Sequence, residues 1–352
     1  MPTKIVYGID ALNDINLYVD NRKTLLVTSS GFVKRGLVDK ITTLCPTIVY
    51  VHSEIKSHPE FIDLEASYQA IKDVDFDVIL AIGGGSVLDA AKFLSVSANN
   101  NGQRCFSFVS DIVRGNIAKE GYELTPIISV PTTAGTGSEI TPWATIWDMA
   151  EKKKYSLHLP DLYSEIALYD PSLTISVPHD ITIQTGLDTL SHALESIWNK
   201  NASPVTIGFA IKSAKLIIET LPRLTKDLSN LDDRNKIMMA CMYAGLAFSN
   251  TQTAIAHGLS YYITANKGVD HGIACSFTLP LLVDRIIGKY SFIDEALTEI
   301  FGELSSEKLR TMFKDLNIST NFIDYGINDE ELEVLKSSLL NNQRADNSLV
   351  SI

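Results

Sequence analysis

The chain has 352 residues, of which 45% are hydrophobic and 20% are charged, and its formal net charge is −12. A single hydrophobic core rarely grows beyond about 250–300 residues, so this length predicts two domains. A negative field attracts neither nucleic acid nor an anionic membrane, and neither is expected as a partner.

The first half of the chain alternates β-branched runs with helical stretches. Strands are predicted at 24–28, 47–51, 77–82 and 127–130. Several of these runs are continuously apolar, as in parallel strands that are buried on both faces. The pattern predicts a Rossmann-like α/β domain with a parallel sheet, and an exposed edge strand near the N-terminus that is able to pair between subunits.

The sequence carries no sign of export or of membrane insertion. Its start, MPTKIVYGID, has no apolar signal segment, and no run of about 18 apolar residues could span a bilayer. Cys45, Cys105, Cys241 and Cys275 are far apart and form no Cys-x-x-Cys pair. We interpret them as buried thiols of a reducing compartment, and expect a cytoplasmic protein.

A glycine-rich turn follows the third predicted strand. Gly83-Gly84-Gly85-Ser86 lies between 77–82 and a helical stretch, VLDAAKFLSVSA. Glycines let the backbone approach a ligand closely and leave the helix N-terminus open to a pyrophosphate. The turn lacks the Gly-x-Gly-x-x-Gly pattern of the usual dinucleotide fingerprint. Ser86 and Asp89 also have the spacing of a capping box, and we expect both features together.

A second loop of small residues, PTTAGTGSE (131–139), follows the strand predicted at 127–130. Its hydroxyl groups and glycines offer hydrogen-bond donors to phosphate and ribose without bulk. Two such loops predict a nucleotide along the edge of the sheet, with its reactive end directed at the second half of the chain.

The second half is predicted to be helical. Helical segments are expected at 183–199, 205–220, 232–247 and 253–264, with later pieces to about residue 340. Pro171 and Pro178 mark a boundary. We therefore expect a dinucleotide-binding α/β domain at 1–178 and a helical, metal-binding catalytic domain at 179–352.

Four residues of this second half form a candidate metal site. Asp188 and His192 are four residues apart, so they lie on one helix face, about 6 Å apart along the axis. On one straight helix His257 and His271 would be about 21 Å apart, but Asn266-Lys267-Gly268 predicts a turn between them. Three nitrogens and one oxygen suit Zn²⁺ or Fe²⁺ better than Ca²⁺ or Mg²⁺. The alternative for each histidine is a core or capping role.

These motifs together resemble the iron-containing alcohol dehydrogenase family over about residues 20–280. The resemblance rests on GGGSVLDAAK (83–92), PTTAGTGSE (131–139), the DPSLT–P segment (170–178), GLDTLSHALES (186–196) and the two later His-Gly elements, in this order. It implies that Asp188, His192, His257 and His271 bind the metal, Fe²⁺ or alternatively Zn²⁺. It also implies dinucleotide contacts from the first two loops and from Lys154, which are here assigned to Gly84, Gly85, Ser86, Asp89, Thr132, Thr133, Thr136 and Lys154.

The chain departs from the family pattern at two positions. Ser29 stands where an acidic residue would often repel a 2′-phosphate, which favours NADPH, although NADH stays open. Tyr261 stands where many members have a further histidine near the nicotinamide. The proton relay at that place would use Tyr261, a water molecule or the ribose hydroxyl.

These departures, together with TPWATIWD, KKKYSL and HGIACSFTLP, resemble the phosphonoacetaldehyde reductase branch of the family. That resemblance implies metal-dependent reduction of phosphonoacetaldehyde to 2-hydroxyethylphosphonate by a homodimer, with NADPH or NADH. A cation would hold the phosphonate, and the residues of suitable type are Arg114, Lys152 and Lys153, unless they are solvated surface charges.

Simple alcohols or 1,2-diols are alternative substrates. Two further function classes stay open, a non-redox NAD- and metal-dependent lyase or synthase of the same superfamily and a nucleotide-binding scaffold.

Overall fold

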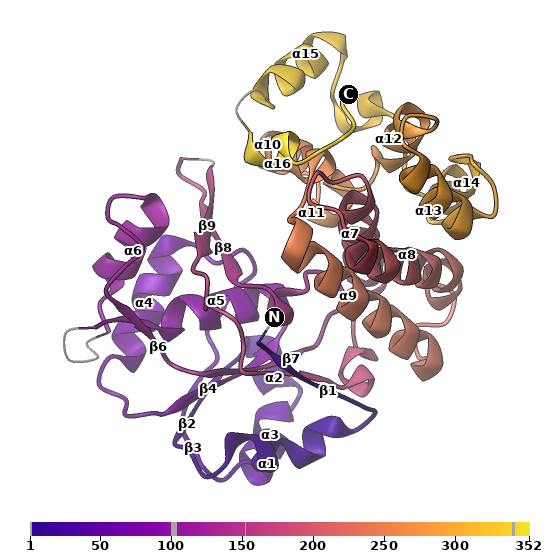
Figure 1. Ribbon diagram of the computed structural model, residues 1–352. Helices are drawn as coiled ribbons and strands as arrows, with labels where there is room; N and C mark the ends of the chain where they lie inside the picture. Colours follow the sequence, from indigo (N-terminus) through magenta and orange to yellow (C-terminus); the bar gives the residue numbers. More distant parts are fainter. Residues whose placement is uncertain (1, 100–103, 152, 340–341) are drawn as a thin grey trace. The chain divides into compact units, whose positions relative to one another are not determined.

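The computed structural model describes residues 2–99, 104–151, 153–339 and 342–352 (Figure 1). The chain forms two compact units. Unit 1 comprises Met1–Thr133 and Ser138–Leu173, and unit 2 comprises Ala134–Gly137 and Thr174–Ile352.

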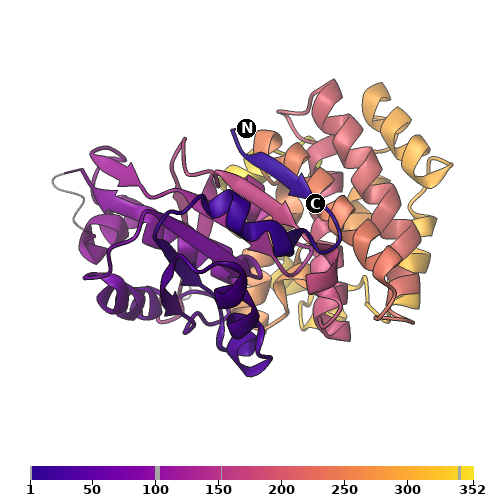
Figure 2. The same ribbon diagram turned by 90° about the horizontal axis from the view of Figure 1, so that it is seen from below.

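Unit 1 is built on a parallel sheet of six strands, in agreement with the predicted fold class. In spatial order the strands are β1 (Lys4–Tyr7), β10 (Ile166–Tyr169), β7 (Ile127–Pro131), β4 (Val78–Gly83), β2 (Thr24–Val27) and β3 (Ile48–His52). Every residue of β2, β4, β7 and β10 is buried, which explains their continuous apolar runs. In Figure 2 the indigo strand β1 lies beside β10, at one edge of the sheet.

Helices cover both faces of this sheet. Successive strand residues such as Leu25 and Leu26 belong to different core clusters, because side chains alternate across a strand. On the Leu25 face lie α4 (Phe61–Ile71), α5 (Gly85–Ser95) and α6 (Phe106–Arg114). On the Leu26 face lie α1 (Ile15–Val19), α2 (Ser30–Lys34) and α3 (Leu37–Leu44), together with the short 3-10 helix η1 (Ala11–Asp14).

Two small antiparallel pairs complete unit 1 and were not predicted. They are β5 (Val96–Ala98) with β6 (Tyr122–Leu124), and β8 (Trp143–Asp148) with β9 (Lys153–His158). The strand β10 was also missed. The four strands predicted between residues 24 and 130 are confirmed to within one residue at either end. Two 3-10 helices lie between β7 and α7 in the chain, η2 (Ser138–Ile140) and η3 (Pro171–Thr174).

Unit 2 is helical, as predicted (Figure 1). Its helices are α7 (His179–Ile197), α8 (Pro204–Leu224), α9 (Leu231–Thr251), α10 (Ile255–Lys267), α11 (His271–Ala274), α12 (Leu279–Ile286), α13 (Ser291–Phe301), α14 (Glu307–Asp315), η4 (Phe322–Tyr325), α15 (Asp329–Ser338) and α16 (Gln343–Asp346). Within the described ranges, no helix of the chain is long and apolar enough to cross a membrane.

Local sequence explains how the central helices begin and pack. Ser203 and Thr206 form a capping box at the start of α8, and Asn230 caps α9. Gly186 permits α7 and α8 to approach closely, because a Cβ there would lie 2.8 Å from the side chain of Leu221. The three long helices α7, α8 and α9 pack against one another, and α7 carries Asp188 and His192.

Candidate functional site

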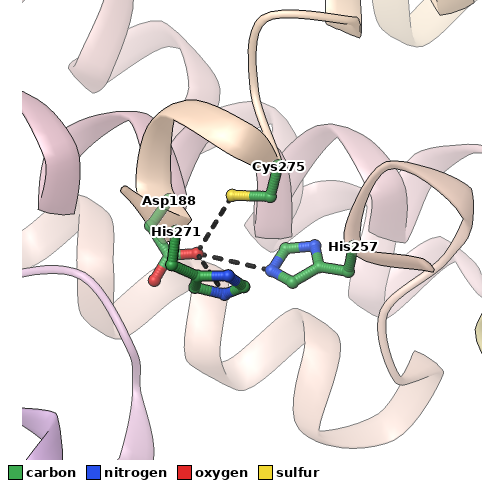
Figure 3. A group of neighbouring side chains, drawn as sticks. All are labelled: Asp188, His257, His271 and Cys275. Atoms are coloured by element: carbon green, nitrogen blue, oxygen red, sulfur yellow. Dashed lines mark hydrogen bonds and ion pairs between the residues drawn. The ribbon is translucent and has the colours of Figure 1, made fainter. Parts of the chain in front are cut away.

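The structure brings together the four predicted metal-site residues, all within unit 2 (Figure 3 draws three of them). Asp188 and His192 lie one turn apart on α7, His257 lies in the first turn of α10, and His271 begins α11. The Nε2 atoms of His257, His192 and His271 lie 3.3, 3.8 and 3.9 Å from the Oδ1 atom of Asp188. Three imidazoles therefore converge on a single carboxylate oxygen.

The return of the chain between His257 and His271 has a clear local cause. Gly268 ends α10 in the left-handed conformation, with φ of 67°, as the predicted turn requires. The next helix, α11, then lies directly against α7, because a Cβ on Gly272 would be 2.0 Å from the carbonyl oxygen of Gln184. The side chain of Gln184 also donates a 2.7 Å hydrogen bond to Asp270. These contacts place His271 beside His257, with ring centroids 5.5 Å apart.

Glu195, which sequence reasoning missed, orients His257. Its Oε2 atom lies 2.6 Å from the Nδ1 atom of His257. The same carboxylate accepts hydrogen bonds from the backbone N–H groups of Ala254, Ala256 and His257 at the start of α10. With Nδ1 engaged in this way, the Nε2 atom of His257 is directed at Asp188. Glu195 lies seven residues after Asp188 and three after His192, so its place on the same face of α7 was visible in the spacing.

The Nε2 atom of His257 provides a test of whether a metal fits. This atom is buried and, apart from its 3.3 Å ion-pair contact with Asp188 Oδ1, it has no hydrogen-bond partner among the residues that the structure describes. Buried polar atoms are rarely left without a hydrogen-bond partner. A metal-binding histidine usually donates a hydrogen bond from its other ring nitrogen, often to a carboxylate. Three imidazole nitrogens and a carboxylate oxygen are also ligands that first-row divalent metals accept. The residues present fit such an ion.

Burial and neighbouring charges shift the pKa values of the side chains in this centre. Burial would raise the pKa of Asp188, but the neighbouring histidines hold it well below its usual range. Burial lowers the pKa of His192 to about 4. Burial has the same tendency at His257, but the carboxylates of Glu195 and Asp188 outweigh it and raise the pKa of His257 to about 9. His192 also packs flat on the ring of Phe248, with centroids 4.0 Å apart.

The thiol of Cys275 lies in the same centre, and sequence reasoning did not place it there. Its Sγ atom lies 3.4 Å from Asp188 Oδ1 (Figure 3). Burial and the carboxylate of Asp188 raise the pKa of this thiol well above its usual value. None of the four cysteines forms a disulfide, but the interpretation of all four as buried is wrong for Cys105, which is half-buried. That residue sits just before α6, in a segment that the core only partly covers.

Tyr261 lies near the centre but at its edge. It follows His257 by one turn of α10, and its half-buried ring is stacked on that of His271, with centroids 6.4 Å apart.

In unit 1, the predicted dinucleotide residues gather where neighbouring strands end. Ser29 follows β2, Gly84 follows β4 and Thr132 follows β7, and β4 pairs with both of the other strands in parallel. Their loops therefore share the carboxyl edge of the sheet, where open α/β sheets bind ligands. Two of the loops touch, because a Cβ on Gly84 would lie 3.2 Å from the hydroxyl of Thr133.

The capping box predicted at Ser86 and Asp89 is wrong. Gly84 is the N-cap of α5, so the helix starts two residues too early for Ser86 to cap it. The hydroxyl of Ser86 accepts a hydrogen bond from the backbone N–H of His58. The carboxylate of Asp89 accepts hydrogen bonds from the Ser138 hydroxyl at 2.7 Å and from the Thr145 N–H at 3.0 Å. Asp89 thus holds the segment after β7 instead of the start of α5.

Lys92, one turn further along α5, strengthens this connection. Its buried ammonium group donates hydrogen bonds to the carbonyl oxygens of Ser138, Thr141 and Trp143. Burial lowers the pKa of Lys92 to about 8. Lys92 was not among the predicted site residues, although it ends the GGGSVLDAAK motif.

The remaining predicted residues are more scattered. Thr136 belongs to the short segment Ala134–Gly137 of unit 2, where Gly135 packs against Thr185 of α7. Lys154 lies on β9, with its ammonium 5.7 Å above the ring of Trp147.

The three cations considered for the phosphonate are not equivalent. Arg114 pairs with Asp148 at 3.1 Å and lies over the ring of Phe61, so its charge is already engaged. Lys153 is exposed and lies above the ring of Tyr155. Lys152 lies outside the described residues.

Comparisons with known proteins cover both units. Residues 2–171 match the family described as iron-containing alcohol dehydrogenase, and residues 182–348 match the C-terminal part of the Fe-containing alcohol dehydrogenase family. An NAD-dependent methanol dehydrogenase of Bacillus methanolicus is 29% identical, over 95% of this chain and 91% of that protein. A sulfoacetaldehyde reductase of Bilophila wadsworthia is 28% identical, over 97% of this chain and 94% of that protein.

A solved structure is similar along the whole chain. The crystal structure of a sulfoacetaldehyde reductase from Bifidobacterium kashiwanohense in complex with NAD⁺ has a TM-score of 0.91 and 26% sequence identity. The match covers 100% of this chain and 94% of that one.

Proposed function

Since this chain belongs to the iron-containing alcohol dehydrogenase family, we propose that it reduces phosphonoacetaldehyde to 2-hydroxyethylphosphonate, with NADPH or NADH and a bound divalent metal. Family membership makes the chain an oxidoreductase of the alcohol dehydrogenase type. The observation that carries the metal dependence is the convergence of three imidazoles on Asp188 Oδ1.

The choice of an anionic aldehyde has two supports. The motifs TPWATIWD, KKKYSL and HGIACSFTLP resemble the phosphonoacetaldehyde reductase branch. Two similar proteins are named sulfoacetaldehyde reductases, and sulfoacetaldehyde is a two-carbon aldehyde with a tetrahedral anionic group, as phosphonoacetaldehyde is. Sulfoacetaldehyde is therefore the second candidate substrate, and simple alcohols are the third, favoured by the similarity to a methanol dehydrogenase.

The metal centre has a defined task in this reaction. Asp188, His192, His257 and His271 would hold the ion, which as a Lewis acid would polarise the substrate carbonyl and stabilise the negative charge that develops on its oxygen. Glu195 keeps the His257 ring in one orientation and one tautomer, with Nδ1–H donated to the carboxylate and Nε2 available as a ligand. We identify the metal with Fe²⁺ or Zn²⁺ from the nitrogen-rich donor set.

The dinucleotide supplies the hydride, and residues of unit 1 bind it. Its pyrophosphate would accept hydrogen bonds from the open N-terminus of α5 at Gly84, Gly85 and Ser86. The loop after β7 is held close to this helix by Asp89 and Lys92, which pre-organises Thr132 and Thr133. A serine at position 29 leaves room for the 2′-phosphate of NADPH. The stacked rings of Tyr261 and His271 support Tyr261 as the protein group of the proton relay.

A panel of aldehydes tests the substrate assignment. Phosphonoacetaldehyde, sulfoacetaldehyde and acetaldehyde would each be offered to the metal-loaded protein with NADPH and, in parallel, with NADH, and kcat/KM would be measured from loss of the reduced nicotinamide. We expect the highest value with phosphonoacetaldehyde. A higher value with sulfoacetaldehyde would keep the anionic-aldehyde class and replace the substrate. A higher value with acetaldehyde would contradict the assignment of an anionic substrate.

A further inference from the structure

The C-terminal segment 342–352 joins the end of α7 to the start of α10 in unit 2, and the proposed function does not use it. Its helix α16, yellow in Figure 1, lies beside α10. We propose that Arg344 and Asn347 of this segment are positioning residues of the metal centre, because they hold the turn from which α10 presents His257. Their role rests on the metal centre of the proposed function and keeps all four of its ligands.

The segment pairs with the residues that follow α7. The backbone N–H of Lys200 donates a 2.8 Å hydrogen bond to the carbonyl oxygen of Asn347. The N–H of Leu349 donates a 2.9 Å hydrogen bond to the carbonyl oxygen of Trp198. The residues between these two bonds form an antiparallel β-bridge. The segment is therefore fixed to the end of the helix that carries two of the four metal-site residues.

The same segment binds the short turn between α9 and α10, which contains Gln252 and Thr253. The side-chain amide of Asn347 donates a 3.1 Å hydrogen bond to the carbonyl oxygen of Thr253. The guanidinium group of Arg344 donates a 2.9 Å hydrogen bond to the side-chain oxygen of Gln252. Asn199, which belongs to the β-bridge, donates a 3.2 Å hydrogen bond from its side chain to the carbonyl oxygen of Gln252. The turn is thus held by the segment and by the residues with which the segment pairs.

Gln252 has a backbone conformation that needs support from its surroundings. Its φ is 63° and its ψ is 175°, a combination that is almost confined to glycine. A residue with a side chain stays in such a conformation only where the surrounding structure holds it there. The hydrogen bond from Arg344 holds the side chain of Gln252, and the hydrogen bond from Asn199 holds its carbonyl group. The turn is therefore a strained element whose shape depends on the C-terminal segment.

The turn leads directly into the residues that present His257. It is followed by Ala254, whose N–H donates a hydrogen bond to Glu195, and His257 lies in the first turn of α10. The segment also lies against the next residue, because a Cβ on Gly258 would be 3.6 Å from the side-chain oxygen of Asn342. A binding constellation tolerates only about 0.5 Å of displacement. A turn that relaxed its strain would therefore move the Nε2 atom of His257 away from the other ligands.

The metal affinity of the folded protein tests this role. Zn²⁺ affinity of the full-length, metal-stripped protein would be measured by chelator competition, after circular dichroism has shown that each variant is folded. Arg344→Ala and Asn347→Ala should each bind Zn²⁺ about threefold to tenfold more weakly, a smaller loss than the roughly 10–100-fold for a group that supports a ligand directly. The control Arg285→Ala should bind as the wild type does, because the exposed Arg285 contacts the same segment at the carbonyl oxygen of Ser351 and not at the turn.

A double-mutant cycle separates positioning from general stabilisation. Glycine adopts the conformation of residue 252 without support, so Gln252→Gly should keep the wild-type Zn²⁺ affinity to within about twofold. In that background, Arg344→Ala should weaken Zn²⁺ binding by less than about twofold, because the strain that it would release is absent. A loss as large as in the wild-type background would contradict the action of Arg344 through the turn.

These outcomes distinguish the positioning role from the proposed function. Failure of the wild type to bind Zn²⁺ would overturn the metal centre itself. Folded Arg344→Ala and Asn347→Ala proteins with wild-type affinity would overturn the positioning role and leave the metal centre intact. An equal loss in Arg285→Ala would also contradict the role, since it would show a general loosening of the segment. If Arg344→Ala did not fold, Asn347→Ala would decide in the same way.

Discussion

Glu195 fixes the orientation of the His257 ring in the candidate metal centre. Its carboxylate accepts the Nδ1–H of His257 and three backbone N–H groups at the start of α10. The same interaction therefore sets the tautomer of the ring and the position of the helix that carries it. A group of this kind acts through the ligand that it supports, so Glu195 is a positioning residue.

Glu195→Gln is predicted to weaken metal binding about 10–100-fold, the usual cost of losing such a supporting carboxylate. The glutamine side chain would also place its NH₂ group, a donor, opposite the backbone N–H donors at the start of α10. Affinity would be measured by chelator competition, with Glu219→Gln, on the exposed face of α8, as the matched control. Unchanged affinity in Glu195→Gln would show that His257 does not depend on this carboxylate.

The pair Arg223–Asp233 gives a pH-dependent contribution to stability. Arg223, on α8, donates two hydrogen bonds of 2.8 and 2.6 Å to Asp233, on α9. The hydrogen bonds from Arg223 hold the pKa of Asp233 below its usual value of 3.8. The folded state thus favours the ionised form of Asp233. The ion pair contributes fully to the free energy of unfolding above the pKa that Asp233 has in the unfolded state, and this contribution is lost as the pH falls through the pKa of the folded state.

We predict that Asp233→Asn costs about 1 kcal/mol at neutral pH, because the arginine is largely exposed and solvent screens the pair. The difference from the wild type should shrink as the pH falls below about 3.8, the unfolded value. Urea unfolding of metal-free protein across pH would measure it. Asp232→Asn, in the same first turn of α9 but exposed, is the control. A cost that does not change with pH would refute the assignment to this ion pair.

At the residue scale, the sequence predicted those site residues whose relation is local. Asp188 and His192 share a helix face at a spacing that can be counted, and Gly268 signals the turn that returns His271. Glu195 and Cys275 have equally regular spacing from His192 and His271. Their places in the centre depend on the tertiary positions of the N-terminus of α10 and of α11. No local sequence pattern predicts those positions.

At the scale of elements, the contact between α11 and α7 holds the centre together. Gly272 meets the backbone of Gln184 so closely that a Cβ would lie 2.0 Å from its carbonyl oxygen. A backbone atom cannot rotate away, so any larger residue must displace α11, and with it His271 and Cys275.

Gly272→Ala is therefore predicted to destabilise the protein by about 1–3 kcal/mol, as overpacking does, and to weaken metal binding as well. Gly208→Ala is the matched control, because Gly208 lies in α8 with open space around its Cβ position. That substitution should stabilise the protein by about 0.5–1 kcal/mol. Thermal unfolding and chelator competition would measure both variants, and a neutral Gly272→Ala would contradict the close packing of α11.

The long apolar elements were predictable, and the short or polar ones were not. A strand such as β4 (VILAIG) is apolar throughout because both of its faces are covered. The four-residue strand β10 is too short to show a period. The strand β9 starts with two lysines and pairs as a hairpin outside the main sheet, so its sequence resembles a solvated loop. The capping box failed because Asp89 has better partners across the fold than its own helix end.

At the scale of the whole molecule, the family match covers both units, and the proposed function assigns a different part of the chemistry to each. Unit 1 presents the loops proposed for the dinucleotide, and unit 2 holds the candidate metal centre. The short segment Ala134–Gly137 groups with unit 2 although its neighbours in sequence belong to unit 1. The fit of Gly135 against Thr185 explains this, and only the folded structure reveals it.

We also propose, from the resemblance, that the chain forms a homodimer. The edge strand β1 pairs with β10 on one side only, within the residues that the structure describes, so its outer backbone groups are available to a second copy of the chain.

Reduction of the aldehyde is proposed to depend on a metal held by the converging imidazoles. The measurement that tests it most directly compares aldehyde-dependent oxidation of NADPH and NADH by metal-stripped, Fe²⁺-loaded and Zn²⁺-loaded wild type with that by His257→Ala, while nucleotide binding is followed separately. We predict activity only in metal-loaded wild type, and unchanged nucleotide binding in the variant. Near-full activity of the stripped protein, or of His257→Ala, would contradict the account.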